Sequence, residues 1–271
     1  DTNRLIFGGT MLQVRNERGT LVYSKIKSKE ASEKIVYNTL TVPVRERFQL
    51  VLADGTKVFL NSGSEMRYPE RFGKARREVF LKGEAWFEVA KDSAREFWVH
   101  AGAMDVKVLG TSFNVKAYER LETVATTLVE GSVEVACAGK SFQIVPGEQF
   151  VYDKNNRVMD VRMVDTESYV SWKDGYYKFR QTTLEEIMET LSVWYGLNVF
   201  YVNESAKQVE FTGKVKRYED ARMLLDKFEQ TGDVVFDIKG NNVFITIKQK
   251  KPFAREWHSF LVKARGMVWQ S

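Results

Sequence analysis

The chain has 271 residues, of which 44% are hydrophobic, and this length allows two globular domains. The mean hydropathy is −0.35, and no apolar run reaches about 18 residues. The sequence therefore predicts no membrane-spanning helix within these residues. The net charge of +5 comes from 41 basic and 36 acidic residues that are well interleaved, so the composition predicts no nucleic-acid-binding protein.

Three short basic clusters lie at Lys74–Arg77, Lys214–Arg217 and Lys248–Lys251. Each cluster adjoins a turn signal, so we interpret all three as solvated loops rather than as a binding face. The single Cys137 allows no internal disulfide. It alternates with two valines, which predicts a thiol buried in a strand.

From residue 11 to about residue 164 the repeated unit is a β-hairpin. The clearest hairpin joins the apolar alternation of residues 50–60 across Asp54-Gly55, because glycine accepts the positive φ that such a turn requires. Similar turns are predicted within residues 12–23, at residues 138–140 and at residues 153–157. With no amphipathic helix between them, these strands predict an all-β sandwich or jelly-roll-like domain.

The stretch Val106–Tyr118 is strand-like at both ends, but its apolar positions change from even to odd numbers across Leu109–Thr111. Side chains alternate along a strand with a period of two, so one extra residue reverses the face that points inward. We therefore expect a strand with a β-bulge or sharp bend at Gly110.

The pattern changes near Trp172. Thr183 and Glu186 form a capping box that predicts the start of a helix, and Gly196 predicts its end. A second helix is predicted up to Gly232, and strands precede and follow both helices. This βαβ pattern, used twice, predicts an α+β domain with two helices on one face of a small mixed sheet.

Three segments follow from these patterns: an all-β domain over 1–168, a small α+β domain over 169–250 and a tail over 251–271. The predicted core positions are Leu52, Leu60, Phe87, Val89, Phe113 and Val115 in the first domain, and Leu184, Ile187, Leu191, Leu224 and Phe228 in the second. In the tail, Phe253, Trp257, Phe260, Leu261 and Ala264 share one helical face. Such a helix would either fold back on the protein or bind a partner.

No pattern in the sequence predicts a catalytic, metal or cofactor site. His100 and His258 stand far apart without the spacing of metal ligands. Glu84 and Glu88 share a strand face beside aromatic residues, and Ser112 lacks the flanking pattern of a nucleophile elbow. We therefore predict a recognition module rather than an enzyme. A carbohydrate-binding module or a jelly-roll enzyme remains the alternative, because jelly-roll clefts commonly hold ligands.

Nine collinear segments between residues 40 and 248 resemble the periplasmic part of FecR-like anti-sigma factors in their Bacteroidetes form. The segments are Leu50–Ser64, Tyr68-Pro69 with Phe72, Val79–Asp92, Val108–Tyr118, Val129–Val135, Pro146–Gln149, Trp172–Phe179, Leu184–Tyr195 and Phe211–Gly213. The second domain also resembles the small fold of secretin and TonB short N-terminal domains.

This resemblance implies a sensor that works by protein–protein contact. Such a sensor relays a signal from an outer-membrane TonB-dependent transducer to an extracytoplasmic-function sigma factor. It also implies a periplasmic location, with the inner-membrane anchor and the cytoplasmic sigma-binding segment lying outside this sequence. No cofactor, metal or nucleic acid is implied.

The strand Tyr176-Tyr177-Lys178-Phe179 is the predicted partner-binding edge. A small domain leaves backbone donors and acceptors free at its sheet edges, and a strand of another chain can pair with them. Adjacent tyrosines supply large contact area with a polar tip. The other interpretation is that Tyr176 or Tyr177 packs internally beside the first helix.

Overall fold

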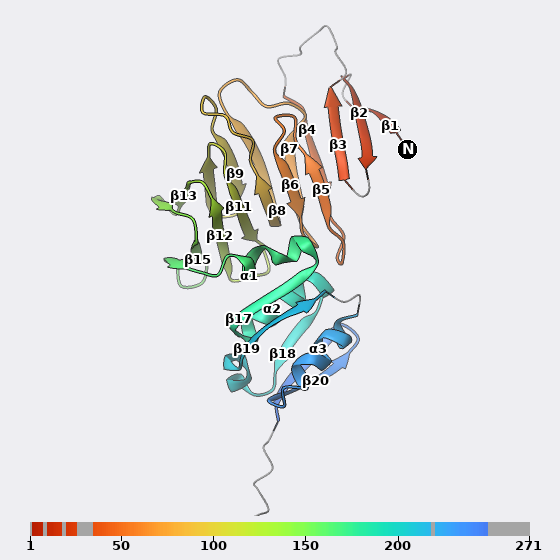
Figure 1. The fold of residues 1–271 in the computed structure, drawn as a ribbon, viewed down its shortest axis with the longest axis vertical. Coiled ribbons are helices and arrows are strands. Elements are labelled where there is room, and N and C mark those ends of the chain that lie inside the picture. The colour runs from red at the N-terminus through yellow and green to blue at the C-terminus, as the bar shows by residue number, and fades with distance from the viewer. Residues whose placement is uncertain (1, 8–9, 18–19, 26–34, 218–219, 249–271) are drawn as a thin grey trace, which may run out of the picture.

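The computed structural model describes residues 2–7, 10–17, 20–25, 35–217 and 220–248, with side chains described from residue 35 onward. The strand-rich part, coloured red to green in Figure 1, lies above a smaller part, coloured cyan to blue, that contains helices. The fold is therefore mainly β with an α+β part, as predicted. The tail 251–271, with both interpretations of it, lies outside the described residues.

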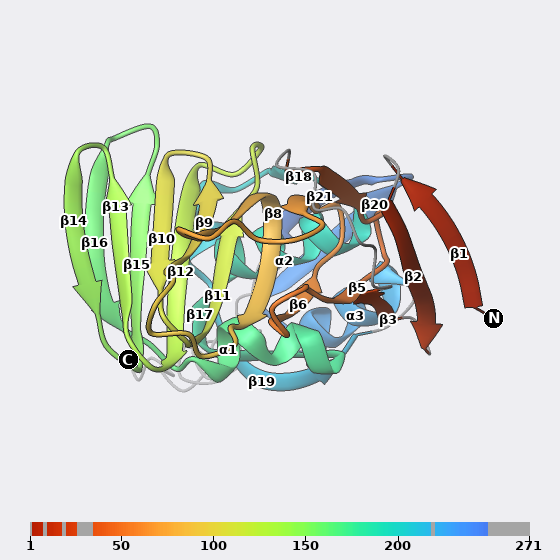
Figure 2. The same cartoon turned by 90° about the horizontal axis from the view of Figure 1, so that it is seen from above.

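The strand-rich part is a sandwich made of one continuous 16-stranded sheet that folds into two layers. Layer one contains, in spatial order, β1 (Thr2–Phe7), β2 (Thr10–Glu17), β3 (Thr20–Lys25), β5 (Phe48–Val51), β6 (Lys57–Leu60), β8 (Arg77–Glu88), β11 (Ser112–Ala117), β12 (Thr123–Glu130), β15 (Glu148–Asp153) and β16 (Val158–Met163). Layer two contains β4 (Tyr37–Thr41), β7 (Glu65–Pro69), β8, β9 (Phe97–Ala101), β10 (Met104–Val108), β13 (Val133–Cys137) and β14 (Lys140–Ile144). Seen from above, the two layers overlap, and β1 and β2 extend layer one beyond the overlap (Figure 2).

Strand β8 joins the two layers because it bends at Gly83. Its first half pairs with β7 and β9, and its second half pairs with β6 and β11. Gly83 has a φ of +108°, and a β carbon there would lie 2.4 Å from Ser64 Oγ. Only glycine fits both the backbone conformation and this close approach.

The phase change in Val106–Tyr118 has a different origin from the one predicted. The stretch is two strands, β10 in layer two and β11 in layer one, and Leu109–Thr111 crosses between them. Both apolar sets, before and after the crossing, lie in one core. The expected sharp bend is present and a register shift follows at Ser112, but the expectation of one continuous strand is wrong.

The core between the layers is formed by the alternating apolar positions. All six positions predicted for this core are buried, and Cys137 is buried in β13 as predicted. The predicted hairpins are also present, with β5 and β6 joined across Gly55, which has a φ of +89°. Period-two alternation was therefore a sufficient signal for these elements.

The prediction for the first basic cluster is wrong at one residue. Arg77 is fully buried, whereas a solvated loop was expected. Its Nη1 donates to Asp54 Oδ2 and to the carbonyl of Ala90, both at 2.8 Å, and its Nη2 donates to the carbonyl of Arg95 at 2.9 Å. The guanidinium is buried because these acceptors replace its hydration.

The C-terminal part begins with two short helical turns and continues as a strand–helix alternation. Its elements are α1 (Glu167–Val170), η1 (Ser171–Asp174), β17 (Tyr176–Thr183), α2 (Leu184–Tyr195), β18 (Asn198–Tyr201), η2 (Glu204–Gln208), β19 (Glu210–Lys216), α3 (Ala221–Glu229), β20 (Val234–Lys239) and β21 (Asn242–Ile247). The expected single mixed sheet is wrong: β17 pairs with β19, and a separate sheet has the order β18-β21-β20. Helices α2 and α3 each connect a strand of the first sheet to a strand of the second.

Helix α2 has the predicted ends. Thr183 Oγ1 accepts a hydrogen bond from the Glu186 amide at 3.3 Å, and Gly196 ends the helix with a φ of +69°. The predicted apolar positions of α2 and α3 pack with both small sheets in one core, which is separate from the core of the sandwich. The boundary at residues 168–169 stays a prediction.

Candidate functional site

The predicted partner-binding strand is the first half of β17, and its four side chains have different environments. Tyr176 is 41% exposed, with Lys214 Nζ 4.9 Å from its ring centroid. Tyr177 and Phe179 are buried in the core of the C-terminal part. Lys178 forms ion pairs with two carboxylates beside α1. The internal packing considered for this strand therefore applies to Tyr177, whereas Tyr176 faces outward.

A buried carboxylate, Glu84 on β8, organises the contact between the sandwich and the C-terminal part. Its two oxygens accept hydrogen bonds from Asn61 Nδ2 at 2.8 Å and Asn114 Nδ2 at 2.9 Å. Asn114 Oδ1 in turn accepts from Trp172 Nε1 on η1 at 3.2 Å. The chain of bonds therefore connects strand β8 to the segment that enters β17. We call the whole contact between the sandwich and residues 167–217 the junction.

The C-terminal end of α2 forms a second part of the junction. Ser62 Oγ lies 3.2 Å from the carbonyl oxygen of Val193 and 3.3 Å from that of Trp194, and it can donate to either. Tyr118 OH donates to the carbonyl of Ser62 at 2.8 Å, which holds this loop in place. A small apolar cluster of Tyr118, Leu121 and Val193 lies beside these bonds.

Two ion pairs and one further hydrogen bond complete the junction. Lys116 Nζ lies 3.7 Å from Glu189 Oε2, and Arg162 Nη2 lies 3.9 Å from Glu186 Oε1. Burial raises the pKa of Glu189, and Lys116 opposes that shift. Arg47 also donates to the carbonyl of Lys173.

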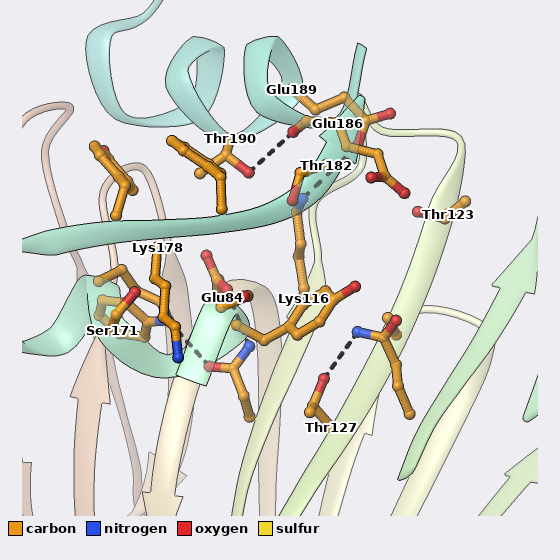
Figure 3. A pocket seen from close by; sticks show the side chains of 18 of the residues that line it. Glu84, Lys116, Thr123, Thr127, Ser171, Lys178, Thr182, Glu186, Glu189 and Thr190 are labelled. Carbon is orange, nitrogen blue, oxygen red and sulfur yellow. Dashed lines mark hydrogen bonds and ion pairs between the residues drawn. The ribbon is translucent and has the colours of Figure 1, made fainter. Parts of the chain in front are cut away.

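A cavity of about 200 Å³ lies within the junction (Figure 3). Strands β11, β12 and β15 form one wall, and η1, β17 and α2 form the other. Its polar lining carries Glu84, Glu186 and Glu189 together with Lys116, Arg162 and Lys178. The charges of these six side chains cancel, so the cavity gives no strong field for a charged ligand.

The described residues contain no group of three or more histidine, cysteine, aspartate or glutamate side chains that could hold a metal ion. Both oxygens of Glu84 already accept hydrogen bonds from asparagine amides, and burial raises the pKa of the Cys137 thiol. Neither group has the environment of a catalytic base or of an activated nucleophile. Among the same residues, no helix is both long and apolar enough to span a membrane.

A row of aromatic rings on the outer face of layer two bears on the sugar-binding alternative. The rings of Phe80 and His100 are 4.9 Å apart with an interplanar angle of 25°, and those of Trp98 and His100 are 6.2 Å apart at 16°. Arg67 lies over the Phe80 ring at 4.7 Å. The ring faces therefore contact one another or a guanidinium, so the row does not form an open stacking platform.

The comparisons with known proteins cover both parts of this fold. Residues 38–134 match the family described as FecR protein, and residues 176–245 match the family described as FecR, C-terminal. The chain belongs to the FecR family. Two crystal structures of a protein provisionally assigned as an anti-sigma factor, from Parabacteroides distasonis ATCC 8503, are 28% and 27% identical to this FecR chain. Each match covers 78% of this chain and 99% of the other, with a TM-score of 0.70. No curated protein matches the chain.

The FecR resemblance predicted from the sequence is thus confirmed, but the junction was not foreseen. Glu84 was considered only as half of a carboxylate pair with Glu88, and the two asparagines that bind it were not singled out. Asn61 and Asn114 lie 23 and 30 residues from Glu84 along the chain. The one local signal is the position of Glu84 within Gly83–Phe87, a stretch whose other members are uncharged.

Proposed function

We propose that this FecR-family chain is the periplasmic sensor region of a transmembrane anti-sigma factor. It relays a signal from an outer-membrane TonB-dependent transducer to an extracytoplasmic-function sigma factor by protein–protein contact. An inner-membrane anchor and a cytoplasmic segment that holds the sigma factor belong to the same protein in this proposal. The chain acts as a regulator and catalyses no reaction.

One observation carries the proposal. Both FecR families match in order, at residues 38–134 and 176–245, and a protein provisionally assigned as an anti-sigma factor aligns over 99% of its own length. The environments of Glu84 and Cys137 support a non-enzymatic role. The stacked ring faces of layer two give no support to the sugar-binding alternative.

The signalling domain of the transducer would bind along β17, at Tyr176–Phe179. Among the described residues β17 pairs with one strand only, β19, so its other edge has no strand partner. Tyr176 is the exposed aromatic residue of this strand, and exposed tyrosines often contribute strongly to protein interfaces. Lys214 Nζ also lies over its ring, a contact that favours this position of the ring.

A binding experiment tests this proposal. Purified signalling domains of TonB-dependent transducers from the source genome are titrated against the chain by calorimetry. Tyr176→Ala should weaken the binding of the cognate domain about tenfold, the size of a typical hot-spot loss. Phe200→Ala is the matched control, because Phe200 is 48% exposed on the other small sheet. Failure of every domain to bind would refute the sensor role. Equal losses of affinity in both variants would show that the binding site is not on β17.

A further inference from the structure

Buried polar atoms without hydrogen-bond partners gather at the junction. Among the described residues these atoms are Asn61 Oδ1, Ser168 Oγ, Ser171 Oγ, Tyr177 OH, Arg217 Nε and Arg217 Nη2, together with Glu70 Oε1 elsewhere. Asn61, Ser168, Ser171 and Tyr177 line the cavity of the junction. A buried polar atom without a partner costs free energy that it would recover once exposed to water. Opening of the junction would therefore cost few protein hydrogen bonds at these side chains, because water can bond to them there.

Arg217 and Tyr177 show this most clearly. The guanidinium carbon of Arg217 lies 3.7 Å from the ring centroid of Trp194 and 5.1 Å from that of Tyr177. The Tyr177 hydroxyl and the Arg217 side chain lie near each other without hydrogen-bond geometry. Burial raises the pKa of Tyr177 and lowers that of Arg217, and their proximity opposes both shifts. Each group is held in an environment that disfavours its charged form.

The forces that close the junction are few. Its apolar contacts are the cluster of Tyr118, Leu121 and Val193 and the buried ring of Trp172, a set much smaller than the cores on either side. Its ion pairs are long and partly exposed, and such pairs contribute little. Parts of a chain joined by a small, polar interface are expected to move relative to each other.

A glycine lies at the point where such movement would be absorbed. Gly175 separates η1, which Trp172 connects to the sandwich, from β17. Its φ is +82°, and no atom lies within 4 Å of where a β carbon would be. Glycine can adopt other dihedral angles there, at the expense of the bond from its amide to the Trp172 carbonyl at 3.1 Å and of the bond that its carbonyl accepts from the Arg217 amide at 3.0 Å.

We propose that the junction is an autoinhibitory contact: closed, it covers one face of β17, and rotation about Gly175 uncovers that strand for a partner. Tyr177 and Phe179, two of the four residues of the partner-binding strand, belong to the core of the C-terminal part and line the junction cavity from that side, so opening exposes the parts of their rings that face the cavity. The regulatory meaning of this contact rests on the proposed function, whereas the opening itself does not. Partner binding and junction opening would then favour each other.

Thiol labelling of the full chain tests the opening without any partner. Ser171→Cys places a thiol in the junction, where Ser171 is 5% exposed, and the native Cys137 is 2% exposed in the sandwich core. Mass spectrometry then measures how fast a thiol reagent modifies each of the two thiols in the same molecule. If the junction opens while the sandwich stays folded, the thiol introduced by Ser171→Cys reacts at least tenfold faster than Cys137. Equal labelling rates would overturn the proposal.

Three additional substitutions, each made in the Ser171→Cys background, set the expected order of junction labelling rates. Ser62→Ala removes the bond to the α2 carbonyls and should accelerate labelling about fivefold. Tyr177→Phe removes a hydroxyl without a partner and should slow labelling by a similar factor. Thr126→Val is the matched control, because Thr126 is buried in the sandwich, its hydroxyl donates to Met104 Sδ at 3.3 Å, and it does not line the junction cavity. Acceleration by Thr126→Val equal to that by Ser62→Ala would contradict the proposal.

The labelling experiment is then repeated in the presence of a transducer domain. A transducer domain that binds the chain should accelerate junction labelling and leave Cys137 protected. If no domain binds, the proposed function fails while the labelling order still tests the junction. If a domain binds and junction labelling is unchanged or slower, the autoinhibitory contact is wrong and the sensor role stands.

Discussion

The buried ion pair between Arg77 and Asp54 gives a strong prediction about stability. The side chains of Arg77 and Asp54 are 0% and 5% exposed, and their closest charged atoms lie 2.8 Å apart. In Arg77→Met, Asp54 keeps only its two bonds from Thr56, and the carbonyls of Ala90 and Arg95 lose their donors. Breaking a buried pair on one side typically costs about 3–5 kcal/mol, because the remaining charge stays uncompensated.

Urea unfolding checks this value. Cys137 lies in the sandwich core, so its reactivity with a thiol reagent reports the unfolding of the sandwich alone. We expect Arg77→Met and Asp54→Asn each to lower the unfolding free energy by about 3–5 kcal/mol. The double variant should lose less than the sum, because neither charge is then left alone. A loss below about 1 kcal/mol in Arg77→Met, or strict additivity, would refute the buried pair.

Three further predictions concern single residues. Gly83→Ala should lower the unfolding free energy of the sandwich by more than about 2 kcal/mol, because the new β carbon would lie 2.4 Å from Ser64 Oγ. Gly240 also has a positive φ but has open space around it, so Gly240→Ala should lower the unfolding free energy by only about 1 kcal/mol in the same urea titration. Cys137 should resist Ellman's reagent in the native protein and react after unfolding, because burial raises its pKa. Burial also raises the pKa of Glu189, so the charged carboxylate destabilises the folded protein at pH 7, and Glu189→Gln should increase the unfolding free energy there. This gain should disappear as the pH falls through the raised pKa, because the native carboxyl is then also neutral. A gain that persists at a pH where the carboxyl is protonated would contradict this.

The local elements could be predicted because their signals are local. Alternating apolar residues and Asp54-Gly55 specify the β5–β6 hairpin within a dozen residues, and Thr183 with Gly196 specifies both ends of α2. Each signal acts through hydrogen bonds or dihedral preferences of near neighbours in sequence. The residues close to each element in sequence are therefore sufficient to predict it.

The features that could not be predicted depend on residues that are distant in sequence. The burial of Arg77 requires Asp54, 23 residues earlier, and carbonyls 13 and 18 residues later. The phase change at Leu109–Thr111 is equally compatible with a bulge within one sheet and with a crossing between two, because both reverse the inward face. Only the pairing of β10 with β9 and β13, and of β11 with β8 and β12, distinguishes the two cases.

The junction shows where this limit bears on function. The two family matches end at residue 134 and resume at residue 176, so the segment that contains Ser171, Trp172 and Gly175 belongs to neither. This segment contributes to how the two parts meet, through the Trp172–Asn114 bond and the glycine that precedes β17. The contacts on either side of it, from Glu84 and Ser62, lie inside the matched ranges. We therefore expect substitutions in residues 167–175 to change how tightly the sandwich and the C-terminal part are held together while both matched folds stay in place.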